Sequence, residues 1–211
     1  MSAPGLTSAI RAEGFANLQL NAGIFIANFD YNTPADATEL KAAVKALIQA
    51  DSPLILGMTS GGGTFTATRE LRQAEVDGRR YAFKGDKFVD SIDAQITSTL
   101  VEITAPNVQR LVSAAAATAS GKTTVSIKTA IDTGTDYLTN VCWIGDLADG
   151  GLVVIALDNA LNTEDFSLAF QDKAEGKMTF GFHAHQGTVN AYDTAPFRVI
   201  FFADEEEDEG E

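Results

Sequence analysis

The sequence predicts a mainly β protein: a β-sandwich or barrel-like domain with one or two flanking helices and a long projecting hairpin arm. Three features of the chain support this fold class. Short segments with alternating apolar and polar side chains recur between residues 124 and 202, as in antiparallel sheets. Only two segments show apolar residues at helical spacing. A threonine- and glycine-rich stretch at residues 59–84 is expected to form a hairpin that is mostly polar on both faces.

Composition limits both the organisation and the surroundings of the chain. Its 211 residues fit one domain, at about residues 1–203, with an N-terminal arm at about 1–16 and an acidic tail at 204–211. The start of the chain lacks the pattern of a signal peptide, no apolar run is long enough to span a membrane, and a single Cys142 excludes an internal disulfide. We therefore expect folding in a cytoplasm, without membrane contact.

The net charge of −14 disfavours ordinary binding to a phosphate backbone. Seven of the 29 acidic residues lie in the last eight positions, DEEEDEGE. Two interpretations of this tail remain open: a solvated segment that aids solubility, or a charged brush that repels DNA and wrong partners.

The first part of the chain predicts a strand, a helix and a short strand. Residues 17–28 alternate as an opening strand, with a bend expected at Gly23. Thr33 and Pro34 suit the start of a helix that Ser52-Pro53 ends, and residues 53–58 read as a short buried strand.

The polar stretch at 59–84 comes next, with its turn at residues 76–79. Such strands bury little against their own domain, so the hairpin is either an arm that contacts another subunit or a surface loop. Residues 87–103 return to alternation, with one face towards a core and the other towards water or a cavity.

A second helix is predicted from Thr104 to Ser120-Gly121, where the glycine would end it. Strands are then predicted at residues 124–129, 137–145, 151–157 and 197–202. The clearest hairpin lies between residues 158 and 186: Phe166, Leu168 and Phe170 share one face of its first strand. Met178, Phe180 and Phe182 share one face of its second strand, after a polar turn at residues 171–177.

No motif in the sequence indicates catalysis, a cofactor or a metal. Ser120-Gly121-Lys122 lacks the earlier glycine and the strand–loop–helix context of a phosphate loop. His183 and His185 share one strand face but would need a third ligand. Cys142, beside a tryptophan in an apolar strand, suits packing better than nucleophilic attack. We expect a protein that is not an enzyme.

Three blocks of the chain resemble the major tail (tail tube) proteins of long-tailed bacteriophages, especially those that infect Gram-positive bacteria. They are ILGMTSGGGTFTATRELRQAEVDGRR at 55–80, STLVEITAPNVQRLV at 98–112, and residues 143–186. Their order along the chain, rather than any strict motif, carries the resemblance. The acidic tail is less typical of that family.

The resemblance implies the tail tube fold, with hexameric rings that stack into a tube, a virion location after assembly in the host cytoplasm, and passage of double-stranded DNA without specific binding. Tape measure, distal tail and tail terminator proteins would be its partners. The implied arm between rings includes Gly61, Gly62, Gly63, Phe65, Arg69, Arg72, Asp77 and Gly78. The implied wall of the lumen includes Asp93, Gln95, Thr97, Asp165, Ser167 and Thr179.

Two alternatives stay open. One is the inner tube of a contractile tail or of a phage-derived bacteriocin, which shares the fold and differs by the sheath around it. The other is a β-sandwich that binds sugar or peptide. That module would carry exposed aromatic residues on loops, whereas the phenylalanines here lie within strand patterns that suit a core.

Overall fold

The computed structural model describes residues 18–19, 21–187 and 194–203, so the predicted N-terminal arm and acidic tail lie outside the described residues. The mainly β fold class is confirmed. The elements are β1 (Ile24–Ala27), α1 (Ala37–Gln49), β2 (Thr59–Gln73), β3 (Lys87–Leu100), α2 (Ala105–Leu111), β4 (Ala114–Ala119), β5 (Lys122–Ile127), β6 (Leu138–Asp146), β7 (Leu152–Asn162), β8 (Leu168–Ala169), β9 (Lys177–His183) and β10 (Phe197–Phe202).

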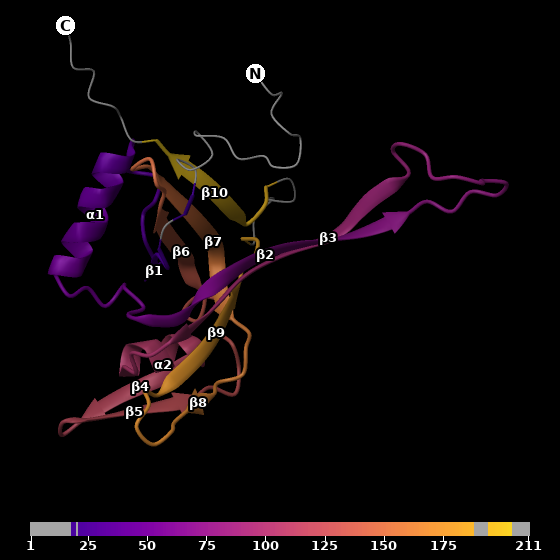
Figure 1. The fold of residues 1–211 in the computed structure, drawn as a ribbon. Helices are drawn as coiled ribbons and strands as arrows, with labels where there is room; N and C mark the ends of the chain where they lie inside the picture. The colour runs from indigo at the N-terminus through magenta and orange to yellow at the C-terminus, as the bar shows by residue number, and fades with distance from the viewer. Residues whose placement is uncertain (1–17, 20, 188–193, 204–211) are drawn as a thin grey trace, which may run out of the picture.

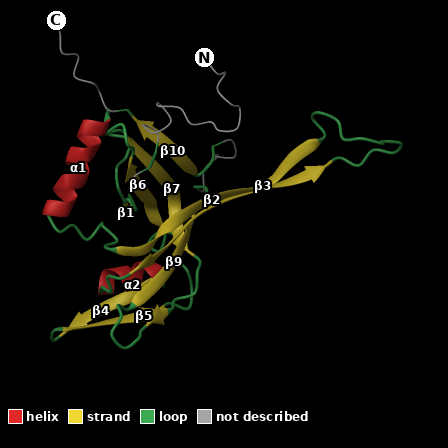
Figure 2. Ribbon diagram, viewed as in Figure 1, coloured by secondary structure: helices red, strands yellow, loops and turns green. Residues whose placement is uncertain are grey.

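The main sheet has eight antiparallel strands and folds over on itself (Figure 1). One part contains β1, β6, β7 and β10, and the other contains β9, β3 and β2, with β8 pairing on β9. Strand β7 joins the two parts: its first residues pair with β6 and β10, and Leu161 and Asn162 at its end pair with β9. Figure 2 shows α1 beside the β1–β6–β7 part, and α2 with the β4–β5 hairpin at another end of the domain.

Two apolar clusters stabilise this arrangement. The larger lies between the two parts of the sheet and includes Phe25, Ile96, Phe180 and Phe182. Phe25 and Phe180 meet edge to face, with ring centroids 5.3 Å apart. Each fully buried side chain of this size contributes about 1.5–3 kcal/mol relative to exposure to water. The second cluster packs α1, through Leu40, onto the outer face of the β1 part.

Near the N-terminus, three boundaries differ from the prediction. Strand β1 is only four residues long, because residue 23 bends the chain with φ +67° before it. Helix α1 is capped by Asp36, whose carboxylate accepts a 2.7 Å hydrogen bond from the Glu39 amide. Thr33 instead donates to Asp30. The segment at 53–58 forms a turn and one bridge, from Ile55 to β1, rather than a strand.

The predicted second helix is wrong beyond Leu111. Ser113 takes a left-handed φ of +46° and ends α2, and the alanine run that follows forms β4. Ser120 and Gly121, with φ of +52° and +76°, form a two-residue turn between β4 and β5 rather than a helix stop. Pairing with the β-branched residues of β5 overrides the helix propensity of alanine.

The hairpin predicted between 158 and 186 is only partly as expected. Its second strand, β9, buries Met178, Phe180 and Phe182 as predicted. Its first strand is reduced to Leu168–Ala169, and Phe170 beyond it is 86% exposed. Phe166 and, on β10, Phe201 are also exposed, so the expectation that these three rings belong to a core is wrong. Neither described helix has the length and apolar character needed to cross a membrane.

Candidate assembly surface

The predicted arm is longer than expected and uses a different second strand. β2 pairs with β3 from Thr59↔Leu100 to Gln73↔Lys87, so the hairpin that projects in Figure 1 is built from β2 and β3. Residues 79–86, expected to return along β2, instead belong to the loop at the tip. The arm and the alternating strand at 87–100 are therefore one element.

The tip loop is organised around the carboxylate of Asp86. Its Oδ2 accepts hydrogen bonds from Gln73 Nε2 at 2.7 Å, from Arg79 at 2.7 Å and from the Phe83 amide at 3.0 Å. The bond from Gln73, with the Phe83 amide and the charge of Arg79, lowers the pKa of Asp86. The backbone amide of Ala74 also donates to the Asp86 carbonyl, at 2.9 Å, which closes the loop.

The predicted arm residues divide between the base and the outer part of the arm. Gly61, Gly62 and Gly63 lie at the base, where a register shift interrupts the pairing with β3. A Cβ on Gly63 would lie 3.0 Å from both the Phe25 ring and the Thr97 carbonyl, so the backbone approaches the core closely there.

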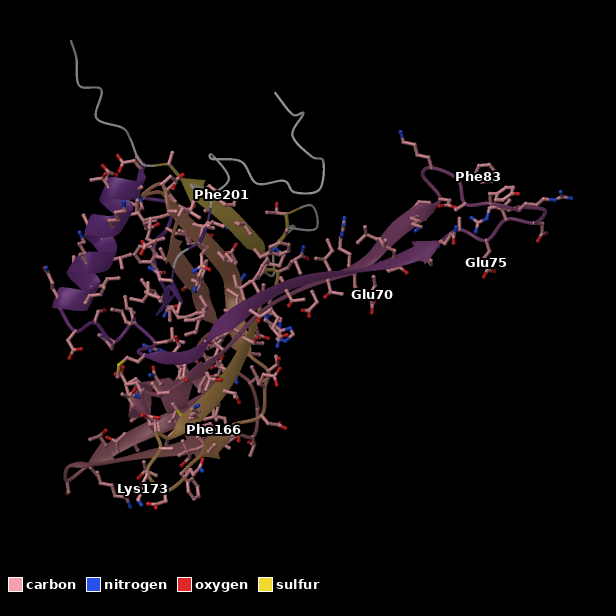
Figure 3. All side chains as sticks on the ribbon, viewed as in Figure 1. Glu70, Glu75, Phe83, Phe166, Lys173 and Phe201 are labelled. Atoms are coloured by element: carbon pink, nitrogen blue, oxygen red, sulfur yellow. The ribbon has the colours of Figure 1, made fainter. Side chains whose placement is uncertain are left out.

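Phe65 also belongs to the base, where its ring packs 5.7 Å from that of Phe197. Arg69 and Arg72 lie on the exposed strand, and Asp77 and Gly78 lie in the turn at the tip. Figure 3 shows the side chains of Glu70, Glu75 and Phe83 along this outer part, away from the domain.

One face of the outer arm carries exposed apolar side chains together with Arg69, Gln73 and Lys87, so it is less polar than expected. Ala94 and Ile96 on β3 face the core, and the same face continues outward through Ile92, Val89 and, on β2, Leu71. These three side chains are 48%, 51% and 52% exposed. At the tip, Val76, Tyr81 and Phe83 are more exposed still. Exposed apolar side chains gathered in this way suit an interaction surface, with Arg69, the direct partner of Ile92, on the same face.

The opposite face of β3 is polar and continues across its neighbours. Register places Thr64, Thr66 and Thr68 of β2 beside Thr97, Gln95 and Asp93 of β3. On the other side, Gln95 and Thr99 lie beside His183 and Thr179 of β9. Four of the predicted lumen residues, Asp93, Gln95, Thr97 and Thr179, therefore share one sheet face.

The other two predicted lumen residues, Asp165 and Ser167, are exposed but precede β8 outside any strand. Two further polar residues join the face. His183 Nδ1 lies 2.9 Å from Asp93 Oδ1, and Gln95 Nε2 donates to Glu164 Oε1 at 3.0 Å. The pairing of β3 with β9 brings them together, and no local signal in the sequence identifies that pairing.

Strand β2 also leaves a long edge unpaired. It ends the strand order β1-β6-β7-β9-β3-β2 and runs for 15 residues without a proline. An exposed edge of this length offers backbone donors and acceptors to another strand. The arm therefore offers two kinds of contact, apolar side chains and an open backbone edge.

The groups considered for chemistry lie in ordinary structural settings. Cys142 is fully buried, and burial raises the pKa of its thiol to about 12. Within the described ranges, no three His, Cys, Asp or Glu side chains gather as metal ligands. His183 contacts Asp93, and the His185 ring meets Tyr137 edge to face.

The sequence matches no protein-family model and no curated protein.

Proposed function

We propose that this chain is a structural subunit, not an enzyme, that assembles with copies of itself into the tail tube of a long-tailed bacteriophage. The observation that carries the proposal is the set of exposed apolar side chains, Leu71, Val89 and Ile92, that continues the core face of the β2–β3 hairpin past the edge of its own domain. A monomer gains nothing from apolar side chains held in water on a projecting arm, whereas a neighbouring subunit that covers them removes their exposure.

The position of the arm supports assembly that propagates. Where each arm meets a different surface on the next subunit in one direction, the contact is heterologous. Heterologous contacts close into rings when the rotation permits and otherwise extend into filaments. The free edge of β2 suits ring closure, because strands joined edge to edge between subunits leave no edge exposed. Six subunits per ring is the number that the family resemblance implies.

The polar face around Thr97 supports the role of a conduit. Hydroxyl and amide side chains predominate there, Asp93 contacts His183, and Glu164 accepts a hydrogen bond from Gln95. Such a wall does not hold phosphates, and the net charge of −14 repels a duplex at longer range. DNA would pass through the bore, with tape measure, distal tail and tail terminator proteins as the further partners in the virion.

The test is electron microscopy of the purified protein beside a variant with a shortened arm. Thr68 and Asp93 are direct partners across the hairpin, so a two-residue Asn-Gly turn can replace residues 69–92. We expect rings or hollow tubes from the full chain at rising concentration. The shortened variant should remain monomeric with an unchanged thermal unfolding midpoint.

Identical tubes from both proteins would contradict the role of the arm. A full chain that stays monomeric at all concentrations, even when mixed with purified tail-tip assemblies that nucleate tubes, would contradict the proposed function. A sheath around tubes isolated from particles would assign the chain to a contractile tail instead.

A binding module is the second candidate, and the exposed rings of Phe166, Phe170 and Phe201 favour it. Figure 3 shows Phe166 and Phe201 at well separated ends of the domain, so they do not form one aromatic site. A glycan or peptide ligand whose binding is lost in Phe170→Ser, in a protein that never forms tubes, would favour this candidate.

A further inference from the structure

A cavity of about 270 Å³ lies between the two parts of the main sheet, beside the inner end of β2. Residues 62–65 of β2 border it on one side, and residues 19–22, just before β1, border it on the other. Apolar side chains form most of its wall: Phe25, Phe65, Ile96, Trp143 and Ile155. No charged side chain lines it among the residues that the structure describes, so the cavity suits an apolar occupant.

The size and the chemistry of the cavity favour a protein side chain over a separate ligand. Sites for drug-sized ligands are typically about 300–1,000 Å³ and place several polar groups around the ligand. Of the five apolar wall residues, Trp143 alone has a polar atom in its side chain, and that Nε1 already donates to the Ala22 carbonyl at 2.8 Å.

The edge of β2 beside the cavity is open to a further strand. Thr64 and Phe65 pair with Thr97 and Ile96 of β3 on one side, and β2 ends the strand order on the other. An extended segment that adds to such an edge gains backbone hydrogen bonds, and a pocket beside the edge accepts one of its alternate side chains. A strand added here would therefore place an apolar side chain in the cavity.

The chain itself has a segment that begins at this place. The described residues start at Leu18, whose carbonyl accepts a 2.9 Å hydrogen bond from the Ala148 amide, and Gln19 lines the cavity. Phe15 is the nearest large apolar residue before Leu18. The four residues from Phe15 to Gln19 can span up to about 14 Å, so Phe15 is within reach of the cavity. The other terminal segment, residues 204–211, contains acidic residues and one glycine, which do not suit an apolar wall.

We propose that the N-terminal segment, residues 1–17, docks in this cavity of its own subunit. The Phe15 ring packs against Trp143 and Phe65, and the neighbouring backbone pairs with the edge of β2. This contact goes beyond the proposed function and does not require it. In a free subunit it would keep the edge of β2 from pairing with other chains, because a covered edge accepts no further strand. Assembly through that edge would then require the segment to leave.

The single tryptophan of the chain, Trp143, allows the proposal to be tested by fluorescence. Acrylamide quenching of its emission is compared in the full-length protein, in Phe15→Ser and in the control Leu6→Ser. The control loses an apolar side chain from the same segment, nine positions further from the cavity. Loss of the buried ring should shift the docking equilibrium at least about tenfold towards the undocked form and raise the quenching constant about twofold. The control should quench like the unchanged protein.

Amide hydrogen exchange measures the pairing on β2 separately from the position of the ring. A docked strand protects those amides of residues 63–68 that point away from β3. They should exchange several-fold faster in Phe15→Ser than in the full-length protein, and exchange in β6 and β7 should not change.

Equal quenching in all three proteins, or unchanged exchange in β2, would overturn the proposal. A quenching constant that falls as the concentration of the full-length protein rises, below the concentration at which tubes form, would also overturn it. That result would assign the cavity to a segment of a second copy. Failure of the proposed function is distinct: a chain that never forms tubes, but whose Phe15→Ser variant shows increased quenching, would contradict only the tube. Tubes from a chain whose quenching is insensitive to Phe15→Ser would contradict only the docked segment.

Discussion

The inner and outer halves of β3 both carry apolar side chains on the core face of the sheet but lie in opposite surroundings. Ala94, Ile96 and Leu100 on the inner half are buried to 2% exposure or less, whereas Ile92 on the same face is 48% exposed. The domain ends between Ala94 and Ile92, but the apolar face of the sheet does not. Alternation is a local property of a strand, whereas burial depends on what packs against it.

The outer half is nevertheless well organised. Its strands remain paired to Gln73↔Lys87, and the tip loop is fixed by the hydrogen bonds that Asp86 accepts. A paired, apolar and exposed hairpin differs from a surface loop, which lacks such order and such side chains. The comparison therefore separates residues that stabilise the subunit from residues that act only when subunits meet.

The largest effect is expected from Ile96→Ala, on the inner half. Ile96 is 2% exposed within the central cluster, so its truncation leaves a cavity and costs about 2–5 kcal/mol in the free energy of unfolding. Urea denaturation followed by circular dichroism measures this loss. A change below about 1 kcal/mol would mean that the inner face of β3 is not packed as the structure shows.

Ile92→Ala is the matched change on the outer half, four residues away on the same strand face. The side chain is half exposed, so the free energy of unfolding of the monomer should change by less than about 0.5 kcal/mol. Assembly should respond instead: the concentration at which tubes form should rise by about fivefold or more, since loss of a buried interface side chain costs about 1 kcal/mol. Light scattering against concentration measures this threshold.

Two outcomes would contradict the assignment of the inner half of β3 to subunit stability and of the outer half to assembly. A monomer destabilised by Ile92→Ala as much as by Ile96→Ala would show that the outer arm folds back onto its own domain in solution. An unchanged assembly threshold, with a stable monomer, would leave the apolar face of the arm without a partner.

The strands of the domain were predictable because their patterns are local. The alternation of β9 correctly placed Met178, Phe180 and Phe182 in the core, and the runs at β6 and β10 were found close to their observed limits. The run at β7 was found, but the strand continues to Asn162, beyond its predicted end at residue 157. The partners of these strands were not predictable, because pairing depends on contacts between distant residues. That is why β3 was not recognised as the second strand of the arm.

The errors have related causes. The alanine run of β4 has high helix propensity, and only its pairing with β5 decides against a helix. The ring of Phe170 follows the right period for a core strand but lies past the last paired residue, Ala169. For the polar face, alternation grouped Asp93, Gln95 and Thr97, whereas His183 and Glu164 join them only through the tertiary fold.

The smallest effect on the whole subunit is expected from Asp86→Asn, which tests the order of the arm tip. An amide keeps one acceptor but loses the charge that favours the bond from Arg79 and the short contact from Gln73. Amide hydrogen exchange should accelerate several-fold in residues 74–86 and remain unchanged in β6 and β7. Asp77→Asn is the control, since Asp77 lies in the same loop and accepts no hydrogen bond from another described residue.

The pH dependence of the tip has a defined sign. The pKa of Asp86 is lowered in the folded arm, so its carboxylate stabilises the tip fully above the pKa of an unperturbed Asp, about 3.9. That contribution is lost as the pH falls from this value through the lowered pKa. Exchange in residues 74–86 of the unchanged protein should therefore approach that of Asp86→Asn only at strongly acidic pH. Equal exchange in the two proteins at neutral pH would show that backbone hydrogen bonds alone stabilise the tip. The paired strands β2 and β3, rather than the Asp86 carboxylate, would then keep the outer arm ordered.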